Sequence, residues 1–318
     1  MPPFFSIIVA TYNRPTQLGA CLESFACLDY PRARFEVIVV DDGSQTPLEA
    51  VVATFHTRLD VTLLRQANAG PGIARNTGAA RARGQFLAFT DDDCRPADDW
   101  LRILALRFRA EPDRAVGGRT VNALPANPYA TASQVLVDYV YAYNNADRDR
   151  ARFLASNNLA LPTDRFHAVG GFAKPWPHPA SEDRDLCDRW LHHGYPMSYT
   201  PEAVIYHAHG LTFRSFSRQH FNYGRGAFGF HRARARRGSG RFRVEIPFYL
   251  HLPLYPLATT RGRRELWLAT LLVISQAASA AGFAWEWMVT RSDETGKPAD
   301  PPGASEQRPA SLQATRAR

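Results

Sequence analysis

The first 93 residues repeat one pattern, in which a short apolar run is followed by a segment with helical spacing of its apolar side chains. The apolar runs occupy residues 5–10, 36–40, 61–64 and 86–89. Apolar strands that alternate with amphipathic helices are typical of a mainly parallel sheet with helices on both faces. The sequence therefore predicts an α/β fold with a doubly wound sheet. The composition, 45% hydrophobic and 21% charged, excludes a disordered chain, a collagen-like repeat and a small disulfide scaffold.

Polar clusters follow three of these runs, at residues 11–14, 41–44 and 91–93. The carboxyl ends of parallel strands meet at one edge of a sheet, and ligands of open α/β sheets bind beyond that edge. We therefore expect the three clusters to lie together and to line a ligand site.

The rest of the first 215 residues continues with less regular spacing. Helices are expected at residues 99–110, 133–143 and 181–192, a turn-rich segment at 117–127 and a strand at 196–207.

Charge is unevenly distributed along the chain. Residues 1–210 contain 21 basic and 23 acidic side chains, whereas residues 211–318 contain 17 basic and 7 acidic ones. Six arginines and no acid fall between Arg232 and Arg243. A near-neutral N-terminal part and a basic C-terminal part indicate a catalytic or binding domain followed by a segment that contacts an anionic surface. This surface is either nucleic acid or acidic lipid headgroups.

An uncharged stretch of 20 residues runs from Leu266 to Trp285, after a basic flank at residues 261–264. About 20 apolar residues are enough to cross a bilayer, and tryptophans near both ends are typical of membrane helices. The stretch is rich in alanine and serine, which leaves open a span, a helix lying on the membrane or a buried soluble helix. Residues 291–318 are rich in proline, serine and charge and are predicted to be disordered.

The four cysteines, Cys21, Cys27, Cys94 and Cys187, form neither a CxxC pair nor a metal-like cluster. We therefore expect free thiols in a reducing compartment. Residues 1–15 have no basic region and no cleavage site, so the apolar start is interpreted as a buried strand and not as a signal peptide.

Three consecutive carboxylates, Asp91, Asp92 and Asp93, follow the fourth apolar run. An aspartate triplet alone is typical of a solvated loop. At the end of a buried strand, level with Asp41 and Asp42 on another strand, the shared negative field favours a bound divalent cation. Oxygen ligands of this kind suit Mg²⁺ or Mn²⁺.

A glycine-containing segment at residues 68–78 follows the third apolar run. It departs from the dinucleotide-binding pattern, because Arg75 stands in place of the third glycine and because it follows the third strand instead of the first. Free N–H groups at the start of its helix, together with Arg75, can contact a phosphate. Alternatively, Arg75 pairs with a carboxylate of the aspartate cluster, and both roles can hold at once.

Two other places allow both a chemical and a structural interpretation. Glu182 and Asp183 begin the helix expected at residues 181–192, where a carboxylate either acts as a general base or stabilises the helix dipole. His207 and His209 share one face of a strand end, where an imidazole either completes a metal site or has a structural role.

Taken in this order along the chain, these features resemble the inverting family-two glycosyltransferases of the GT-A fold. The resemblance covers residues 4–215, and the order of its short motifs is specific. The motifs lie at residues 6–14, 40–44, 68–78, 91–93, 157–158, 170–172 and 182–186. It implies a Rossmann-like nucleotide-binding part at residues 1–93 and an acceptor part at residues 94–215.

The resemblance also implies roles for individual residues. Asp183 matches the catalytic base, with Glu182 beside it. Asp91, Asp93 and His207 match the residues that hold Mn²⁺ or Mg²⁺. The nucleotide and donor sugar are expected to contact Thr11, Tyr12, Arg14, Asp41, Asp42, Arg75, Asp92, Asn157 and Asn158.

The reaction implied is sugar transfer from a nucleoside-diphosphate sugar to a hydroxyl acceptor. A base such as Asp183 takes the acceptor proton, and one displacement inverts the anomeric configuration without a covalent intermediate. We expect transfer of a single sugar, because the region after residue 215 is too short for the channel of processive synthases. In addition, Arg218-Gln219-His220-Phe221 is not their Gln-x-x-Arg-Trp motif.

Residues 216–290 are expected to form a basic and apolar extension with a membrane-associated helix at residues 266–287. This predicts a peripheral protein, or one with a single C-terminal span, at the cytoplasmic face of the inner membrane, with an anionic membrane surface as partner. A nucleotidyltransferase is a weaker alternative, because no lysine-bearing glycine loop follows the first strand. A nucleic-acid-binding protein is disfavoured by sparse aromatic interleaving, so no nucleic-acid partner is expected.

Overall fold

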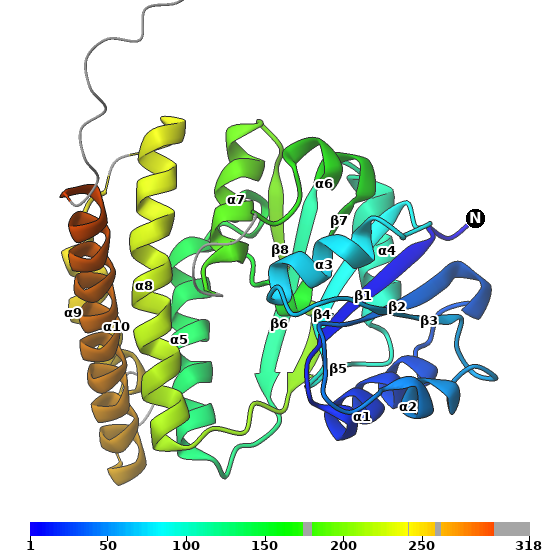
Figure 1. Cartoon of the computed structure of the whole chain (residues 1–318), viewed down its shortest axis with the longest axis horizontal. Coiled ribbons are helices and arrows are strands. Elements are labelled where there is room, and N and C mark those ends of the chain that lie inside the picture. Colours follow the sequence, from blue (N-terminus) through cyan, green and yellow to red (C-terminus); the bar gives the residue numbers. More distant parts are fainter. Residues whose placement is uncertain (174–179, 241, 258–261, 296–318) are drawn as a thin grey trace, which may run out of the picture.

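A single eight-stranded sheet forms the centre of the protein, in the order β3-β2-β1-β4-β7-β6-β8-β5. The computed structural model describes residues 1–173, 180–240, 242–257 and 262–295. Helices cover the sheet, and a group of long helices lies beside it (Figure 1). The strands are β1 (Phe5–Thr11), β2 (Phe35–Asp41), β3 (Val61–Arg65), β4 (Phe86–Asp91), β5 (Cys94–Pro96), β6 (Ala115–Asn122), β7 (Leu159–Pro162) and β8 (Met197–His207).

The helices of the sheet layers alternate with these strands. They are α1 (Pro15–Ala26), α2 (Glu49–Ala53), α3 (Pro71–Ala79), α4 (Trp100–Ala110), α6 (Thr163–Val169) and α7 (Glu182–His192), with 3-10 turns η1 (Arg32–Arg34), η2 (Arg148–Arg150) and η3 (Ser156–Asn158). The helices beside the sheet are α5 (Pro128–Asn144), α8 (Phe213–Arg237), α9 (Ile246–His251) with the 3-10 turn η4 (Leu252–Leu257), and α10 (Arg263–Thr295).

The N-terminal half follows the predicted alternation of strand and helix. Strands β3, β2, β1 and β4 pair in parallel. Alternate residues of β1 face opposite sides, so that Ile7 and Val9 pack with α1, α2 and α4, whereas Ile8 packs with α3, α6 and α7. A sheet that is buried on both faces explains why its strands read as continuous apolar runs.

The second half of the sheet makes the whole sheet mixed. Strand β7 is antiparallel to both β4 and β6, and β5 is antiparallel to β8, whereas β6 and β8 are parallel. One expectation was wrong here: the segment at residues 117–127 is not turn-rich throughout, because β6 extends to Asn122. The glycines Gly117 and Gly118 suggested a turn but lie inside this strand, where a Cβ on Gly118 would overlap the side chain of Asn158.

The long C-terminal helices pack closely together and against α5. A Cβ on Gly224 of α8 would collide with the carbonyl oxygen of Ser279 on α10, and one on Gly282 with that of Phe221. The two backbones are therefore in contact, as in membrane helix pairs with small residues at the interface. The predicted helix at residues 266–287 is present but longer, and residues 291–295, predicted to be disordered, belong to it. The remainder of the predicted disordered tail lies outside the described residues.

Candidate active site

Three strand ends meet at the carboxyl edge of the parallel strands. The register pairs Thr11 with Asp41 and Ala10 with Asp91, so the polar clusters at residues 11–14, 41–44 and 91–93 lie side by side. The predicted convergence of these clusters is therefore confirmed.

Asp92 joins the first and fourth strand ends. Its carboxylate accepts hydrogen bonds from Thr11 Oγ1 at 2.7 Å and from Arg14 Nη1 at 3.0 Å. Arg14 Nη1 also lies 3.0 Å from Asp93 Oδ2, and its half-exposed guanidinium thus neutralises two adjacent carboxylates. Burial raises the pKa of Asp92 to about 6, despite the opposing charge of Arg14. Tyr12, beside them, is 44% exposed and available to a ligand.

Asp41 and Asp42 organise the loops around the site. Asp41 is buried and accepts a hydrogen bond from the backbone N–H of Ser44 at 2.8 Å. Asp42 accepts from Gln66 Nε2 and from the backbone N–H groups of Ala69 and Gly70, at 2.7 to 2.9 Å. Three of about four acceptor positions of the Asp42 carboxylate are therefore used inside the protein. Asp42 therefore holds the glycine loop in place.

Arg75 connects the glycine-loop helix α3 to two carboxylates. Its Nη2 lies 2.6 Å from Asp91 Oδ1, and its Nη1 lies 3.3 Å from Glu182 Oε1 on α7. The predicted pairing of Arg75 with the aspartate cluster is confirmed. The Arg75 side chain is only 5% exposed, and its Nε is buried without a hydrogen-bond partner among the described residues. The guanidinium is thus bound to carboxylates through both amino groups, and its charge lies next to the aspartate cluster.

The first turns of α3 and α7 meet at this arginine. The side chain of Glu182 packs near Gly72, at the beginning of α3. The positive dipole ends of both helices are therefore close together, which favours an anion such as a diphosphate nearby.

Asp183 follows Glu182 in the first turn of α7 and is partly buried. Its Oδ1 accepts a hydrogen bond from the backbone N–H of Arg184 at 2.7 Å. Burial, together with the negative charge of Glu182, raises the pKa of Asp183 to about 6. A carboxylate with this pKa is mostly ionised at pH 7 but binds a proton far better than an ordinary aspartate, which is the property that a general base needs.

Asp93 and His207 lie together at the ends of β4 and β8. The Asp93 Oδ1 to His207 Nε2 distance is 3.1 Å, and the His207 ring stacks on His209. Burial lowers the pKa of His207, but the hydrogen bond and charge of Asp93 outweigh it, and the net shift is upward. The sulfur of Cys94 is within 4.8 Å of both ligand atoms, a grouping that the sequence analysis did not anticipate.

The donor set is suitable for a hard divalent cation. Asp93 and His207 offer oxygen and nitrogen on converging side chains. Asp91, the third ligand expected from the sequence, is 31% exposed but lies outside this group of ligand atoms, and its Oδ1 is bound to Arg75. Burial raises the pKa of the Cys94 thiol well above its ordinary value. A thiol is a soft ligand, whereas the oxygen and nitrogen donors of Asp93 and His207 suit a harder divalent cation.

The two asparagines of the 157–158 motif differ in availability. Asn157 is partly exposed and has a weak contact with Thr120 at 3.4 Å. Asn158 is 1% exposed, accepts from Trp100 Nε1 and donates to the carbonyl oxygens of Arg119 and Ala203. The structure contradicts the expected contact of Asn158 with the donor sugar, since its side chain joins α4, β6 and β8 inside the core.

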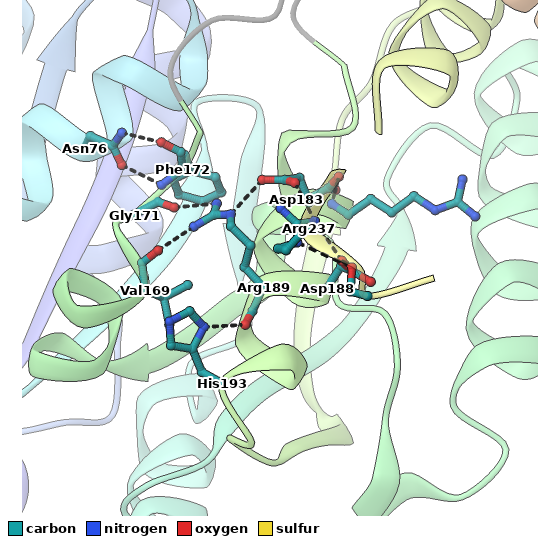
Figure 2. A network of polar contacts seen from close by, with 12 residues as sticks. Asn76, Val169, Gly171, Phe172, Asp183, Asp188, Arg189, His193 and Arg237 are labelled. Carbon is teal, nitrogen blue, oxygen red and sulfur yellow. Dashed lines mark hydrogen bonds and ion pairs between the residues drawn. The ribbon is translucent and has the colours of Figure 1, made fainter. Parts of the chain in front are cut away.

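A network of polar contacts fixes the turn at residues 170–172, which follows α6 (Figure 2). Asn76, next to Arg75 on α3, donates to the carbonyl of Phe172 and accepts from its N–H, both at 2.8 Å. Arg189 on α7 donates to the carbonyl oxygens of Val169 and Gly171. The glycine-rich turn at residues 170–172 is thus held by α3 on one side and by α7 on the other.

Helix α8 also lies near the site, which the sequence did not lead us to expect. Tyr223 is 44% exposed, and its hydroxyl accepts a hydrogen bond from Gln219 Nε2 at 2.7 Å. Burial of the hydroxyl end raises the pKa of Tyr223, and the charges of Asp183, Glu182 and Asp91 raise it further. The i, i+4 spacing of Gln219 and Tyr223 was the available signal, but nothing in the sequence linked α8 to the strand ends.

A doubly wound sheet with glycine loop, aspartate cluster and acidic helix start at one edge is the arrangement of the GT-A glycosyltransferases, which take their sugar from a nucleotide. The family model described as "Glycosyl transferase family 2" matches residues 6–172, slightly over half of the chain. The chain therefore belongs to glycosyl transferase family 2. The predicted family and fold class are confirmed, and the nucleotidyltransferase alternative is not supported.

Individual relatives agree with this assignment. The chain is 26% identical over 228 residues to Glycosyltransferase AglE of Haloferax volcanii, covering 70% of this chain and 73% of the relative. It is 27% identical over 229 residues to Validoxylamine A glucosyltransferase of Streptomyces hygroscopicus, covering 63% of this chain and 54% of that longer protein. The chain thus spans only about half the length of some of its curated relatives.

A solved structure supports the fold. The mannosyltransferase PcManGT from Pyrobaculum calidifontis, in complex with GDP-Man and Mn²⁺, superposes with a TM-score of 0.58 at 23% sequence identity. The match covers 94% of this chain and 82% of that one.

Proposed function

We propose that the protein is an inverting, metal-dependent glycosyltransferase that moves one hexose or deoxyhexose from a nucleoside-diphosphate sugar to a hydroxyl acceptor. The observation that carries this proposal is the position of Arg75 between Asp91 and Glu182. This arginine brings the glycine-loop helix, the aspartate cluster and the start of α7 to one edge of the sheet.

The nucleotide part of the donor is assigned to the loops after β1 and β2. Tyr12 is exposed for stacking on the base, and Asp42 keeps one acceptor position for a base N–H. The diphosphate is assigned to the adjacent N-termini of α3 and α7, beside the positive charge of Arg75. Donors aimed at this place stabilise the negative charge that grows on the leaving diphosphate.

Asp183 is assigned the role of general base. Its raised pKa, about 6, lets it accept the proton of an acceptor hydroxyl as the oxygen attacks the anomeric carbon. In the same displacement the bond from the anomeric carbon to the diphosphate oxygen breaks, and its electron pair leaves with the nucleoside diphosphate. The configuration inverts because the attack comes from the side opposite the leaving group.

Asp91, Asp93 and His207 are assigned to hold Mn²⁺ or Mg²⁺. When bound, such a cation supplies Lewis-acid stabilisation of the diphosphate charge. Arg14 and Thr11 keep Asp92 and Asp93 in place, and Arg75 orients Asp91. The contribution of these side chains is thus to fix the carboxylates at the strand ends.

We also propose that the protein associates with an anionic membrane surface at the cytoplasmic face of the inner membrane, through α10. This helix is long and apolar enough to cross a membrane, and only 28% of its most apolar stretch is buried. Trp267 and Trp285, near the ends of that stretch, are about half exposed. Because α10 packs along α8 and α8 packs on α7, we favour a helix that lies on the bilayer over one that spans it.

The basic stretch has more than one partner. Arg234 and Arg237 form ion pairs with Asp188 on α7, so they face the catalytic domain and not the lipid. Arg236 is exposed and remains available to anionic headgroups.

The test is a transfer assay with UDP-, GDP- and dTDP-sugars, Mn²⁺ and a panel of hydroxyl acceptors. We expect one donor class to give a glycoside whose anomeric configuration, read by NMR, is opposite to that of the donor. Retention of configuration would contradict the single displacement, and absence of transfer from every donor would contradict the proposed activity.

A further inference from the structure

We propose that Arg237, at the C-terminal end of α8, is a positioning residue for Asp183, and that α8 thereby couples the membrane-facing helix α10 to the base. This inference rests on the proposed function of Asp183. No motif of the family-matched region includes Arg237, since that region ends at residue 172.

Arg237, at the C-terminal end of α8, forms ion pairs with two aspartates of α7. We call this pair of contacts the Arg237 clamp. Arg237 Nη2 lies 3.1 Å from Asp185 Oδ1 and 2.7 Å from Asp188 Oδ2. Asp188 also accepts from Ser239 Oγ at 2.6 Å and faces Arg234 Nε at 3.1 Å. Asp185 and Asp188 lie two and five residues after Asp183 on α7, so this contact acts on the first turns of the base helix (Figure 2).

Asp185 connects Arg237 to the turn at residues 170–172, through Arg189. Its carboxylate is 2% exposed and is shared between Arg237 and Arg189, whose Nε lies 2.7 Å from Asp185 Oδ2. Arg189 in turn holds the carbonyl oxygens of Val169 and Gly171. A buried carboxylate that loses one of two cationic partners is left poorly compensated, so removal of Arg237 strains the whole turn.

Apolar and backbone contacts place α8 against the same turn. A Cβ on Gly226 would overlap the carbonyl oxygen of Ala180, which shows that α8 passes directly over the residues before α7. The guanidinium of Arg184, next to Asp183, lies over the ring of Phe230 at 5.0 Å. Asp183 is therefore followed on α7 by a residue, Arg184, that packs on α8.

The other side of α8 is joined to α10. Arg225 Nε on α8 is 2.7 Å from Glu286 Oε2 on α10, and Phe216 packs with Leu268 and Leu271. A shift of α10 on a membrane is thus transmitted through one rigid helix to the start of α7. Because a misplacement of about 1 Å can cost a factor of about 100 in rate, a small shift is sufficient to matter.

The test compares Arg237→Ala, Arg237→Lys and a matched control, Arg214→Ala, in the full chain. Arg214 is an exposed arginine at the opposite end of the same helix. We expect Arg237→Ala to lower kcat by a factor of about 10 to 100 while the KM for the donor changes less than threefold. We expect Arg237→Lys to recover part of the rate and Arg214→Ala to behave as wild type.

Hydrogen–deuterium exchange of the α7 amides supplies a readout that does not depend on activity. We expect faster exchange at residues 182–192 in Arg237→Ala and unchanged exchange in Arg214→Ala. Wild-type exchange in α7 together with wild-type kcat in Arg237→Ala would overturn the inference. A wild-type protein that transfers no sugar would instead overturn the proposed function, whatever the exchange shows. If Arg237→Ala fails to fold, the same measurements on Asp188→Asn decide the question.

Discussion

Arg75 Nη2 on α3 lies 2.6 Å from Asp91 Oδ1 at the end of β4, so the glycine-loop helix is tied directly to the aspartate cluster. The guanidinium is buried and reaches Glu182 with its other amino group. The Arg75 guanidinium therefore sets the distance between the aspartate cluster, where the metal is proposed to bind, and α7, which carries the proposed base.

Replacement of the base is expected to separate chemistry from binding. Asp183→Asn keeps the shape of the side chain but cannot accept a proton at neutral pH, so kcat should fall by a factor of about 10² to 10⁴. Donor affinity, measured by calorimetry, should change little. Asp164→Asn, an exposed aspartate in the first turn of α6, is the matched control and should be unaffected. Wild-type turnover in Asp183→Asn would reject the assignment.

The pH dependence of kcat should report the same group. Asp183 has a pKa of about 6, raised by burial and by Glu182, and transfer requires its ionised form. Activity should therefore fall about tenfold per pH unit below pH 6. The same shift should lower the free energy of unfolding as the pH rises from about 4 to 6, because the folded form holds the proton more tightly. An acid limb centred near pH 4 would show that Asp183 is not the titrating group.

Mn²⁺-dependent binding of the nucleoside diphosphate should depend on the oxygen ligand of Asp93 and the nitrogen ligand of His207. Asp93→Ala and His207→Ala are expected to weaken Mn²⁺-dependent binding of a nucleoside diphosphate at least tenfold, because each removes one of the converging donors. Cys94→Ala should leave it nearly unchanged, since a hard cation such as Mn²⁺ prefers oxygen ligands to sulfur. The measurement is a titration of the diphosphate with Mn²⁺ and again with EDTA. A large effect at Cys94 alone would indicate a softer metal than the one proposed.

Asn158 is expected to affect stability and not donor recognition. Its side chain makes three hydrogen bonds in the core, with Trp100 and with the carbonyl oxygens of Arg119 and Ala203. Asn158→Ala leaves buried groups without partners and should lower the free energy of unfolding by about 2–4 kcal/mol in denaturant titrations. The KM of the folded variant for the donor should be near wild type. A stable Asn158→Ala with a strongly raised KM would reinstate the sugar contact expected from sequence.

Membrane association should depend on the exposed face of α10. Leu266, Trp267 and Trp285 are 60%, 47% and 51% exposed, so their combined replacement by serine should release the protein from anionic liposomes without unfolding it. Leu106→Ser, on the exposed side of α4, is the control for loss of an exposed apolar side chain. Truncation before α10 is a poorer test, because it uncovers Phe216 in the core between α8 and α10. Continued flotation of the triple variant would argue against this surface.

The sequence was sufficient to predict the parallel half of the sheet and the meeting of its strand ends. Buried parallel strands have a distinctive apolar pattern, and polar residues at their ends must lie at one edge. The second half was harder, since the strand at residues 115–122 contains Gly117, where Leu154 needs space, and Gly118, where Asn158 needs space. Periodicity alone cannot show such long-range packing.

Within the site, too, some residue roles could be predicted from the sequence, whereas others depend on tertiary contacts. The pairing of Arg75 with the aspartate cluster was one of two interpretations of its position, because a buried arginine needs an acidic partner. Whether Asn158 faces a ligand or the core depends on contacts with α4 and β8, which are distant in sequence. The approach of α8 to Asp183 and the clamp by Arg237 are likewise tertiary features without a local signal.

The most direct test of the central claim is a calorimetric titration of the wild-type protein with UDP, GDP and dTDP in the presence of Mn²⁺. We expect one of the three to bind with micromolar affinity, and EDTA or Asp93→Ala to weaken that binding at least tenfold. Equal affinity with and without the metal, or no binding of any nucleoside diphosphate, would contradict a metal-assisted nucleotide-sugar site at the edge of the sheet.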